Sequence, residues 1–114
     1  MRAVLLLAGD GGRSASAGEL GGRTGRLAAW VEGLRASGTL LGGGHIDGPV
    51  LTVRTAGGAP AVISLPGATS GEVHAWLLVS VPDMEAAVGL ARSCPESRFA
   101  DVRVLPVDAA GSFP

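Results

Sequence analysis

Short runs of hydrophobic residues follow one another along the chain, and most of them have the length and spacing of strands. The first run, residues 2–8, is nearly continuous, as expected of a strand that is buried on both faces. Further strand segments are expected at residues 40–46, 50–55, 61–65, 73–81 and 101–107. Glycine and proline separate them at residues 47–49 and in a hairpin turn over residues 56–60.

Two helices are expected between these strands. Residues 25–37 carry apolar side chains at helical spacing, namely Leu27, Trp30, Val31 and Leu34. Thr24 is the expected N-cap of this helix, and Ser37-Gly38 is expected to end it. Asp83 is the expected cap of the second helix, residues 83–93. The apolar face of that helix consists of Met84, Ala87, Val88 and Ala91.

The order of these elements is strand, helix, strand, extra strand, strand, helix, strand. It predicts an α+β fold of the ferredoxin-like, split βαβ type, with an antiparallel sheet and both helices on one face. We expect one domain over residues 1–107 and a flexible tail over residues 108–114. The glycine-rich residues 9–25 are either a flexible connection or a lid over a pocket.

Two helices can cover only one face of a four-stranded sheet, so the other face must meet water, a ligand or a second copy of the chain. Alternation along residues 73–81 turns the odd-numbered residues toward the helices. The open face then receives His74, Trp76, Leu78 and Ser80, joined by Asp101 and Arg103, with Arg54 as a further candidate. These side chains suit a pocket for a planar, anionic or polyhydroxylated ligand, or alternatively a polar dimer interface with ion pairs.

The composition limits the kinds of partner. The 114 residues are 46% hydrophobic and 17% charged, which is typical of a globular protein. With a formal net charge of −1, neither nucleic acid nor an anionic membrane surface is an expected partner. No stretch approaches the roughly 20 apolar residues of a membrane span. The single cysteine, Cys94, cannot form a disulfide within the chain, so a cytoplasmic location and a structural role for Cys94 are expected.

Five stretches of the chain resemble the YCII-related proteins, including their DGPF-domain branch. They are MRAVLLLAGD at the start, LRASGTLLGGGHIDGP, LTVR, VSVPDMEAAVGLARSCP and the closing VRVLPV. These segments stay in register over nearly the whole chain. The resemblance implies a ferredoxin-like subunit that pairs into a dimeric α+β barrel, with a small-molecule pocket between sheet and helix.

The chain departs from that family at its best-known sites. Before the central strand the DGPF branch carries Asp-Gly-Pro-Phe and a glycine-tyrosine strand entry, whereas this chain has ISLPGATSGEVHAWLLV. Asp47-Gly48-Pro49-Val50 resembles the motif but lies one hairpin too early, and we interpret it as coincidence. Another branch uses a His-Asp pair with the histidine near the first helix, and the first predicted helix of this chain has no histidine.

His45 and Asp47 are one candidate pair for acid/base chemistry. On a regular strand the two side chains would share a face, where a carboxylate can orient an imidazole. Alternatively, Gly48-Pro49 ends the strand at Asp47, whose carboxylate then caps the turn through local hydrogen bonds.

His74 is the histidine that the sequence favours for function. It stands two residues from Trp76 on the open sheet face, where an imidazole has no core-packing role. A half-buried imidazole at this point needs a hydrogen-bond partner, and Asp101 or Glu72 is expected to supply it.

No cofactor or metal is expected. The Gly9-Asp10-Gly11-Gly12 run lacks the third glycine of a dinucleotide fingerprint, since Ser14 holds that position. The two histidines and Cys94 also lack the spacing of metal ligands.

We therefore expect an enzyme of cofactor-independent acid/base type, a lyase, isomerase or cyclase such as those of secondary metabolism. It would act on a small molecule in a pocket between sheet and helix. The candidate catalytic residues are His74, Asp101, His45 and Asp47, and the candidate substrate-binding residues are Trp76, Arg103, Arg54 and Ser80. The alternative is a homodimer that binds small molecules or other partners without catalysis.

Overall fold

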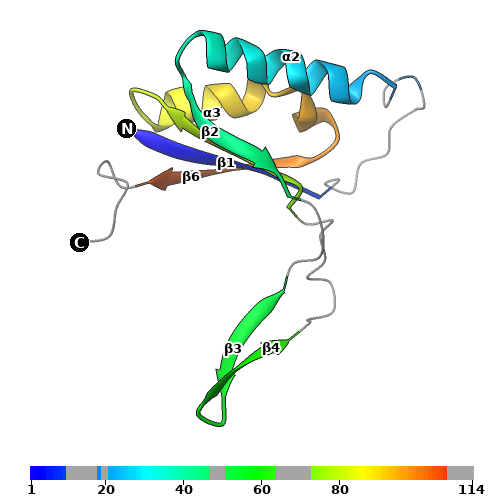
Figure 1. Ribbon diagram of the computed structural model, residues 1–114. Coiled ribbons are helices and arrows are strands. Elements are labelled where there is room, and N and C mark those ends of the chain that lie inside the picture. Colours follow the sequence, from blue (N-terminus) through cyan, green and yellow to red (C-terminus); the bar gives the residue numbers. More distant parts are fainter. Residues whose placement is uncertain (10–17, 19–20, 47–50, 64–72, 108–114) are drawn as a thin grey trace.

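The fold is built on a four-stranded antiparallel sheet whose strands lie in the order β2-β5-β1-β6 (Figure 1). The computed structural model describes residues 1–9, 18, 21–46, 51–63 and 73–107. The strands of this sheet are β1 (Arg2–Ala8), β2 (Leu40–His45), β5 (Ala75–Ser80) and β6 (Asp101–Val107). This order is the ferredoxin-like split βαβ arrangement that the sequence predicts.

Two helices, α2 (Arg23–Ala36) and α3 (Met84–Ser93), lie on one face of the sheet, and the short 3-10 helix η1 (Pro95–Arg98) follows α3 (Figure 1). Asp83 caps α3 as expected, because its Oδ1 accepts a hydrogen bond of 2.8 Å from the Ala86 amide. The prediction that Thr24 caps α2 is wrong. That helix already begins at Arg23, after Gly22, so Thr24 lies inside its first turn.

The hydrophobic core lies between the sheet and the helices. Alternate side chains of the two central strands point into it: Ala3, Leu5 and Leu7 from β1, and Ala75, Leu77 and Val79 from β5. Leu34, Val81, Ala87, Ala91 and Cys94 complete this cluster. The predicted alternation over residues 73–81 is therefore confirmed. No helix among the described residues covers the opposite face of the sheet, so that face is open.

A separate two-stranded hairpin consists of β3 (Thr52–Ala56) and β4 (Ala59–Ile63). Gly57 and Gly58 form its turn with φ angles of +64° and +88°, which glycine adopts without steric cost and which a type I′ turn requires. The turn is shorter than the predicted residues 56–60 because these two glycines alone reverse the chain. In Figure 1 the hairpin projects from the sheet on the side opposite to the helices.

Several expectations fall on residues outside the described part of the chain. These are the lid over most of residues 9–25, the turn at residues 47–49 with Asp47, the entry to the central strand with Glu72, and the tail over residues 108–114. None of the helices in the described part has the length and apolar character needed to cross a membrane.

Candidate small-molecule pocket

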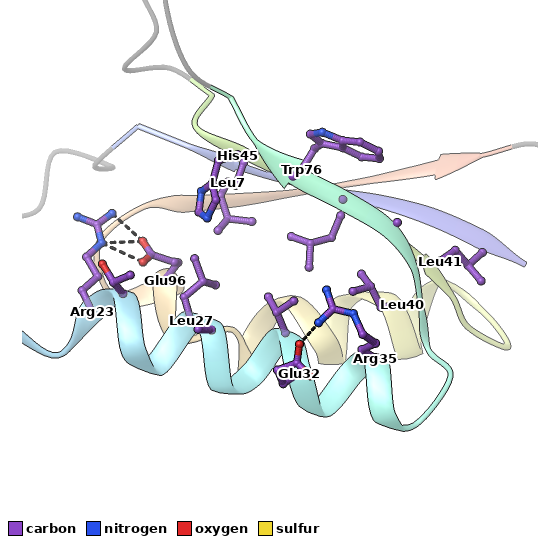
Figure 2. Close-up of a pocket in the computed structure, with 18 residues that line it drawn as sticks. Leu7, Arg23, Leu27, Glu32, Arg35, Leu40, Leu41, His45, Trp76 and Glu96 are labelled. Carbon is purple, nitrogen blue, oxygen red and sulfur yellow. Dashed lines mark hydrogen bonds and ion pairs between the residues drawn. The ribbon is translucent and has the colours of Figure 1, made fainter.

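A pocket of about 590 Å³ lies between α2 and the edge strand β2 (Figure 2). The middle of the pocket is apolar and is lined by Leu7, Leu27, Ala28, Val31, Leu40 and Leu77. Charged and polar side chains lie at its two ends: Arg23, Glu96 and His45 at one, and Glu32 and Arg35 at the other. A cleft of this size, with apolar walls and few polar groups, is typical of small-molecule binding sites.

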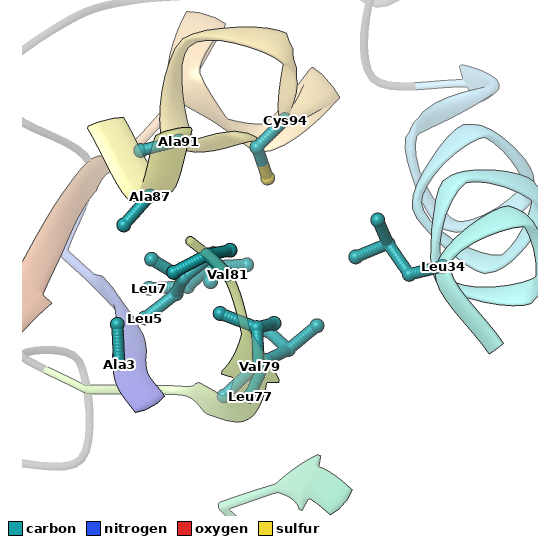
Figure 3. Packing of buried hydrophobic residues seen from close by; sticks show 11 residues of the cluster. Ala3, Leu5, Leu7, Leu34, Leu77, Val79, Val81, Ala87, Ala91 and Cys94 are labelled. Atoms are coloured by element: carbon teal, nitrogen blue, oxygen red, sulfur yellow. The ribbon is translucent and has the colours of Figure 1, made fainter. Parts of the chain in front are cut away.

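The pocket exists because α2 packs loosely on the sheet. Leu34 is the buried residue of this helix, whereas Leu27, Trp30 and Val31 are only partly buried. In Figure 3 Leu34 is set apart from the side chains that the sheet and α3 contribute to the core. Below the helix, Gly43 lies opposite Leu77 in the sheet and adds no side chain that could fill the space.

Arg23 and Glu96 form the most buried charged pair that lines the pocket. The Arg23 Nε donates to Glu96 Oε1 and Oε2 at 2.9 and 2.8 Å, and one terminal nitrogen lies 2.6 Å from Oε2. Glu96 is only 4% exposed, and the guanidinium also stacks over the Phe99 ring at 4.9 Å. The hydrogen bonds that Arg23 donates to Glu96 raise the pKa of Arg23. A guanidinium held in place by a carboxylate therefore stands at this end of the pocket.

His45 reaches the same end of the pocket from the end of β2. Its partner in the sheet register is Ala75, whose side chain is in the core, so His45 lies on the helix side of the sheet. Figure 2 shows its ring extending from the strand toward the Arg23–Glu96 pair. The imidazole is exposed, and it has no hydrogen-bond partner within the described residues. It is thus available to exchange a proton with a bound molecule.

The opposite end of the pocket is marked by the ion pair between Glu32 and Arg35, one turn apart on α2. Both side chains are more than half exposed, so water screens this pair. The two arginines are twelve residues apart on one helix, which corresponds to about 18 Å along its axis. The pocket is therefore a groove along α2 with an ion pair near each end.

Glycines bring β2 close to Trp76 of the neighbouring strand. A Cβ at Gly43 would lie 2.6 Å from the Trp76 carbonyl oxygen, so a side chain cannot be added there without moving the backbone. Cβ atoms at Gly42 and Gly44 would lie 4.0 and 3.6 Å from the indole, which spans the open face beside β2. Trp76 contributes to the lining of the pocket even though its ring is on the open face.

Of the eight residues that the sequence proposes for the site, the pocket brings together only His45 and Trp76. Asp101, Arg103 and Ser80 lie on the open sheet face, where Leu6 of β1 stands between Arg103 and Trp76 in the register. Arg54 lies on the hairpin instead of the four-stranded sheet, so it does not join that face. The remaining two are Asp47, outside the described residues, and His74.

His74 immediately precedes β5 and does not line the pocket. Its backbone amide donates to the Leu7 carbonyl at 2.8 Å, and its carbonyl accepts from the Ile46 amide at 3.0 Å. The imidazole is half-buried, as the sequence suggests, but its buried Nε2 has no hydrogen-bond partner among the residues that the structure describes. The expected partnership with Asp101 is therefore not formed through this atom.

Arg23 and Glu96 are pocket residues that the sequence does not single out. Arg23 belongs to the glycine-rich stretch that precedes the predicted helix, and Glu96 follows Pro95 in a short 3-10 helix. Pro95 at the start of a helical turn is a recognisable local signal. However, nothing local connects two residues that are 73 positions apart, and only the fold brings them together.

Among the described residues there is no group of three His, Cys, Asp or Glu side chains arranged to bind a metal ion. Cys94 is buried in the core, and this burial raises the pKa of its thiol. Its packing agrees with the structural role expected from the sequence.

Comparison with known proteins shows a likeness of fold to a solved structure. No family model matches the chain, and a search of the curated proteins finds no match. Among solved structures the fold is similar to 5-chloro-2-hydroxyhydroquinone dehydrochlorinase from Burkholderia phenoliruptrix AC1100, solved in complex with 2,5-dihydroxybenzoquinone. The TM-score is 0.50 at 15% identity, over 95% of this chain and 94% of that one. The likeness supports the α+β fold with two helices on an antiparallel sheet.

Proposed function

We propose that the protein is a small-molecule enzyme of cofactor-independent acid/base type, a lyase, isomerase or cyclase that works in the pocket between α2 and β2. The observation that carries this proposal is the placement of two groups at the same end of an apolar cleft. They are a fixed guanidinium and an imidazole that has no hydrogen-bond partner among the described residues. The apolar walls suit the body of a small ring compound, and the cation suits an oxygen that carries negative charge.

In this mechanism His45 accepts the proton that the substrate loses. The electron pair of the broken bond passes to a substrate oxygen or expels a leaving group, and the protonated imidazole returns the proton to product or solvent. Arg23 stabilises the negative charge that develops on the oxygen, since a guanidinium held in a fixed position can donate hydrogen bonds to it. Glu96 does not touch the substrate. It holds the guanidinium in place through its two oxygens.

For the substrate we propose a small hydroxylated ring. The structurally similar dehydrochlorinase acts on a chlorinated hydroxyhydroquinone and is solved with a dihydroxybenzoquinone. Such rings are planar and carry ionisable oxygens, which fits the aliphatic walls and the arginine of this pocket. The proposal for this chain rests on its own pocket, and the similar protein supplies the first compounds to test.

The test combines binding with turnover. Calorimetric titration with 2,5-dihydroxybenzoquinone is expected to show binding, and a panel of hydroxylated rings that includes 5-chloro-2-hydroxyhydroquinone is assayed for proton or chloride release. His45→Ala is expected to reduce turnover by about 100-fold or more, with the fold intact by circular dichroism. His74→Ala is the matched control. If His74→Ala abolishes turnover while His45→Ala is silent, the site is on the open face, as the sequence alone suggests.

A second candidate is a binding protein without catalysis. The observation that favours it is that His45 has no acidic partner among the described residues to orient it. In that case the titration shows binding with no turnover of any compound in the panel. Arg23→Gln is then expected to weaken binding of anionic rings, whereas His45→Ala changes it little.

We further propose that the chain is a diverged YCII-related protein that forms a homodimer through its open sheet face, in the cytoplasm. The open face supports the dimer, because it exposes Trp76 and Leu105 in line with the half-buried Val4, Leu6 and Leu78. The single, buried Cys94 thiol suits a reducing compartment.

A further inference from the structure

Within the part of the chain that the structure describes, the β3–β4 hairpin is not packed against the four-stranded sheet or the helices. Among the described residues its two strands make extensive contact only with each other. A two-stranded hairpin of this size is marginally stable in water unless another surface covers it. The radius of gyration, 16.1 Å, exceeds the roughly 13 Å expected of a compact chain of this length, in agreement with a projecting arm.

One face of the hairpin is apolar. Val53 and Val62 lie directly opposite each other in the register, so their side chains share this face. They are 65% and 64% exposed, and Leu51 next to β3 is exposed as well. The other face carries Arg54 opposite Ala61 and Thr52 opposite Ile63. The exposed pair of β-branched side chains predicts that the first face meets a protein surface, whereas the second face carries a charged residue.

The direction in which the hairpin projects indicates that a second copy of this chain covers its apolar face. It leaves the sheet on the side of the open face, where the proposed second subunit docks (Figure 1). Facing sheets pack about 10 Å apart, whereas five-residue strands extend the hairpin by about 17 Å. A hairpin of that length therefore passes beyond the sheet of the second subunit and runs along its side. In a two-fold symmetric dimer each subunit contributes one hairpin, so the same contact occurs twice.

The size of the open face also favours such a contact. Four strands of about seven residues cover a projected area of roughly 19 by 23 Å. Stable dimers bury about 800 Å² of accessible surface on each partner, so a sheet of this size alone gives a contact at the small end of the range. Two hairpins that each cover part of the opposite subunit supply additional apolar area.

We propose that the β3–β4 hairpin is an arm that grips a second copy of this chain, with Val53, Val62 and Leu51 against the partner. The proposal rests on the homodimer proposed above and adds the hairpin to its interface.

Photo-crosslinking of the full chain tests the arm directly. Benzoylphenylalanine is placed at Val62 on the apolar face or at Ala61 on the other face of the same strand. Mixing chains labelled with heavy and light nitrogen distinguishes crosslinks between subunits from those within one. We expect crosslinked dimers from position 62 and at least about fivefold fewer from position 61. Equal yields, or crosslinks only within one chain, would overturn the arm.

A second measurement, the dissociation constant of the dimer, tests the arm where crosslinking yields are low. Val53→Glu is expected to raise the dimer dissociation constant about tenfold or more, and Ala61→Glu, with the same added charge on the opposite face, by less than about twofold. If the wild-type chain is monomeric in light scattering at micromolar concentration, both the dimer and the arm are rejected. If it is a dimer that Val53→Glu leaves unchanged, only the arm is rejected, and neither result bears on turnover at His45.

Discussion

At the scale of single residues, the Arg23–Glu96 pair has the largest energetic consequence of the contacts in the pocket. It joins the first turn of α2 to the 3-10 helix after α3, and it is formed by a carboxylate that is almost completely buried. A buried carboxylate remains charged only where donors satisfy both of its oxygens, and here one guanidinium supplies them.

Replacing Glu96 by Gln is expected to lower the free energy of unfolding by about 1–3 kcal/mol. The amide keeps the shape of the side chain but cannot accept charged hydrogen bonds on both atoms. The loss stays below that of a fully buried pair because Arg23 is 31% exposed and can turn toward water. Urea denaturation measures it. Arg35→Gln, which breaks the exposed pair with Glu32, is the control and should change stability by less than about 0.5 kcal/mol.

Cys94 gives the chain a simple response to alkaline pH. The folded state raises the pKa of the thiol above its ordinary value, so between the two pKa values the unfolded chain loses a proton that the folded chain keeps. The contribution of the thiol to the free energy of unfolding is therefore fully present below its ordinary pKa. It is lost as the pH rises from that value through the raised pKa of the folded state. The sequence has no Lys or Tyr, so neither of these side chains contributes to this decline.

Denaturation of the wild-type chain between pH 8 and pH 10.5 is expected to show this decline, and Cys94→Ala should remove most of it. The native thiol should also resist alkylation by iodoacetamide at pH 8 until denaturant is added. Rapid labelling of the native protein, or the same slope in both chains, would show that burial does not control this thiol.

At the scale of elements, the glycines of β2 determine how the pocket forms. Strand β2 lies close to β5, with a register irregularity between Leu40 and Gly42 and a close backbone approach at Gly43. Helix α2 lies above β2 and is separated from it by the pocket. The sequence shows these three glycines plainly. It does not show that their lack of side chains opens a cleft, because the helix that covers them lies in a different part of the chain.

Gly43→Ala and Gly42→Ala form a matched pair of variants. The first puts a Cβ 2.6 Å from the Trp76 carbonyl oxygen and should lower the free energy of unfolding by about 1–3 kcal/mol, because the backbone of an edge strand must move. The second makes an ordinary contact of 4.0 Å with the indole and should be nearly neutral. Thermal denaturation compares them. Equal melting temperatures would mean that β2 shifts outward at little cost.

At the scale of the whole molecule, the open sheet face and the hairpin leave apolar surface that a small chain cannot cover by itself. Leu105 stands on the open face, exposed, opposite Val4 in the register. Leu105→Glu places a charge on this face and is expected to convert a dimer to monomers at micromolar concentration. Ala29→Glu adds the same charge to the outer side of α2 and should leave the dimer intact. Light scattering coupled to gel filtration measures both, and a dimer that tolerates Leu105→Glu has its interface elsewhere.

The sequence by itself determined the elements and their order. Periodicity along residues 73–81 and the Asp83 cap act within a few positions, so local physics predicts the strand, the helix and the side of the sheet that each residue faces. The ferredoxin-like order follows from those elements, because two helices of this length return the chain to the same sheet.

Only the tertiary structure decided which polar side chains lie together in the pocket. The sequence favoured His74 and the open face, where alternation places Trp76 and Arg103. The pocket instead lies on the helix side, where His45 shares one end with Arg23 and Glu96. The physical reason is that the pocket arises from the imperfect fit of α2 on a glycine strand, and the ion pair at its end joins residues 73 positions apart. Neither the fit of two surfaces nor a long-range contact leaves a periodic pattern in the chain.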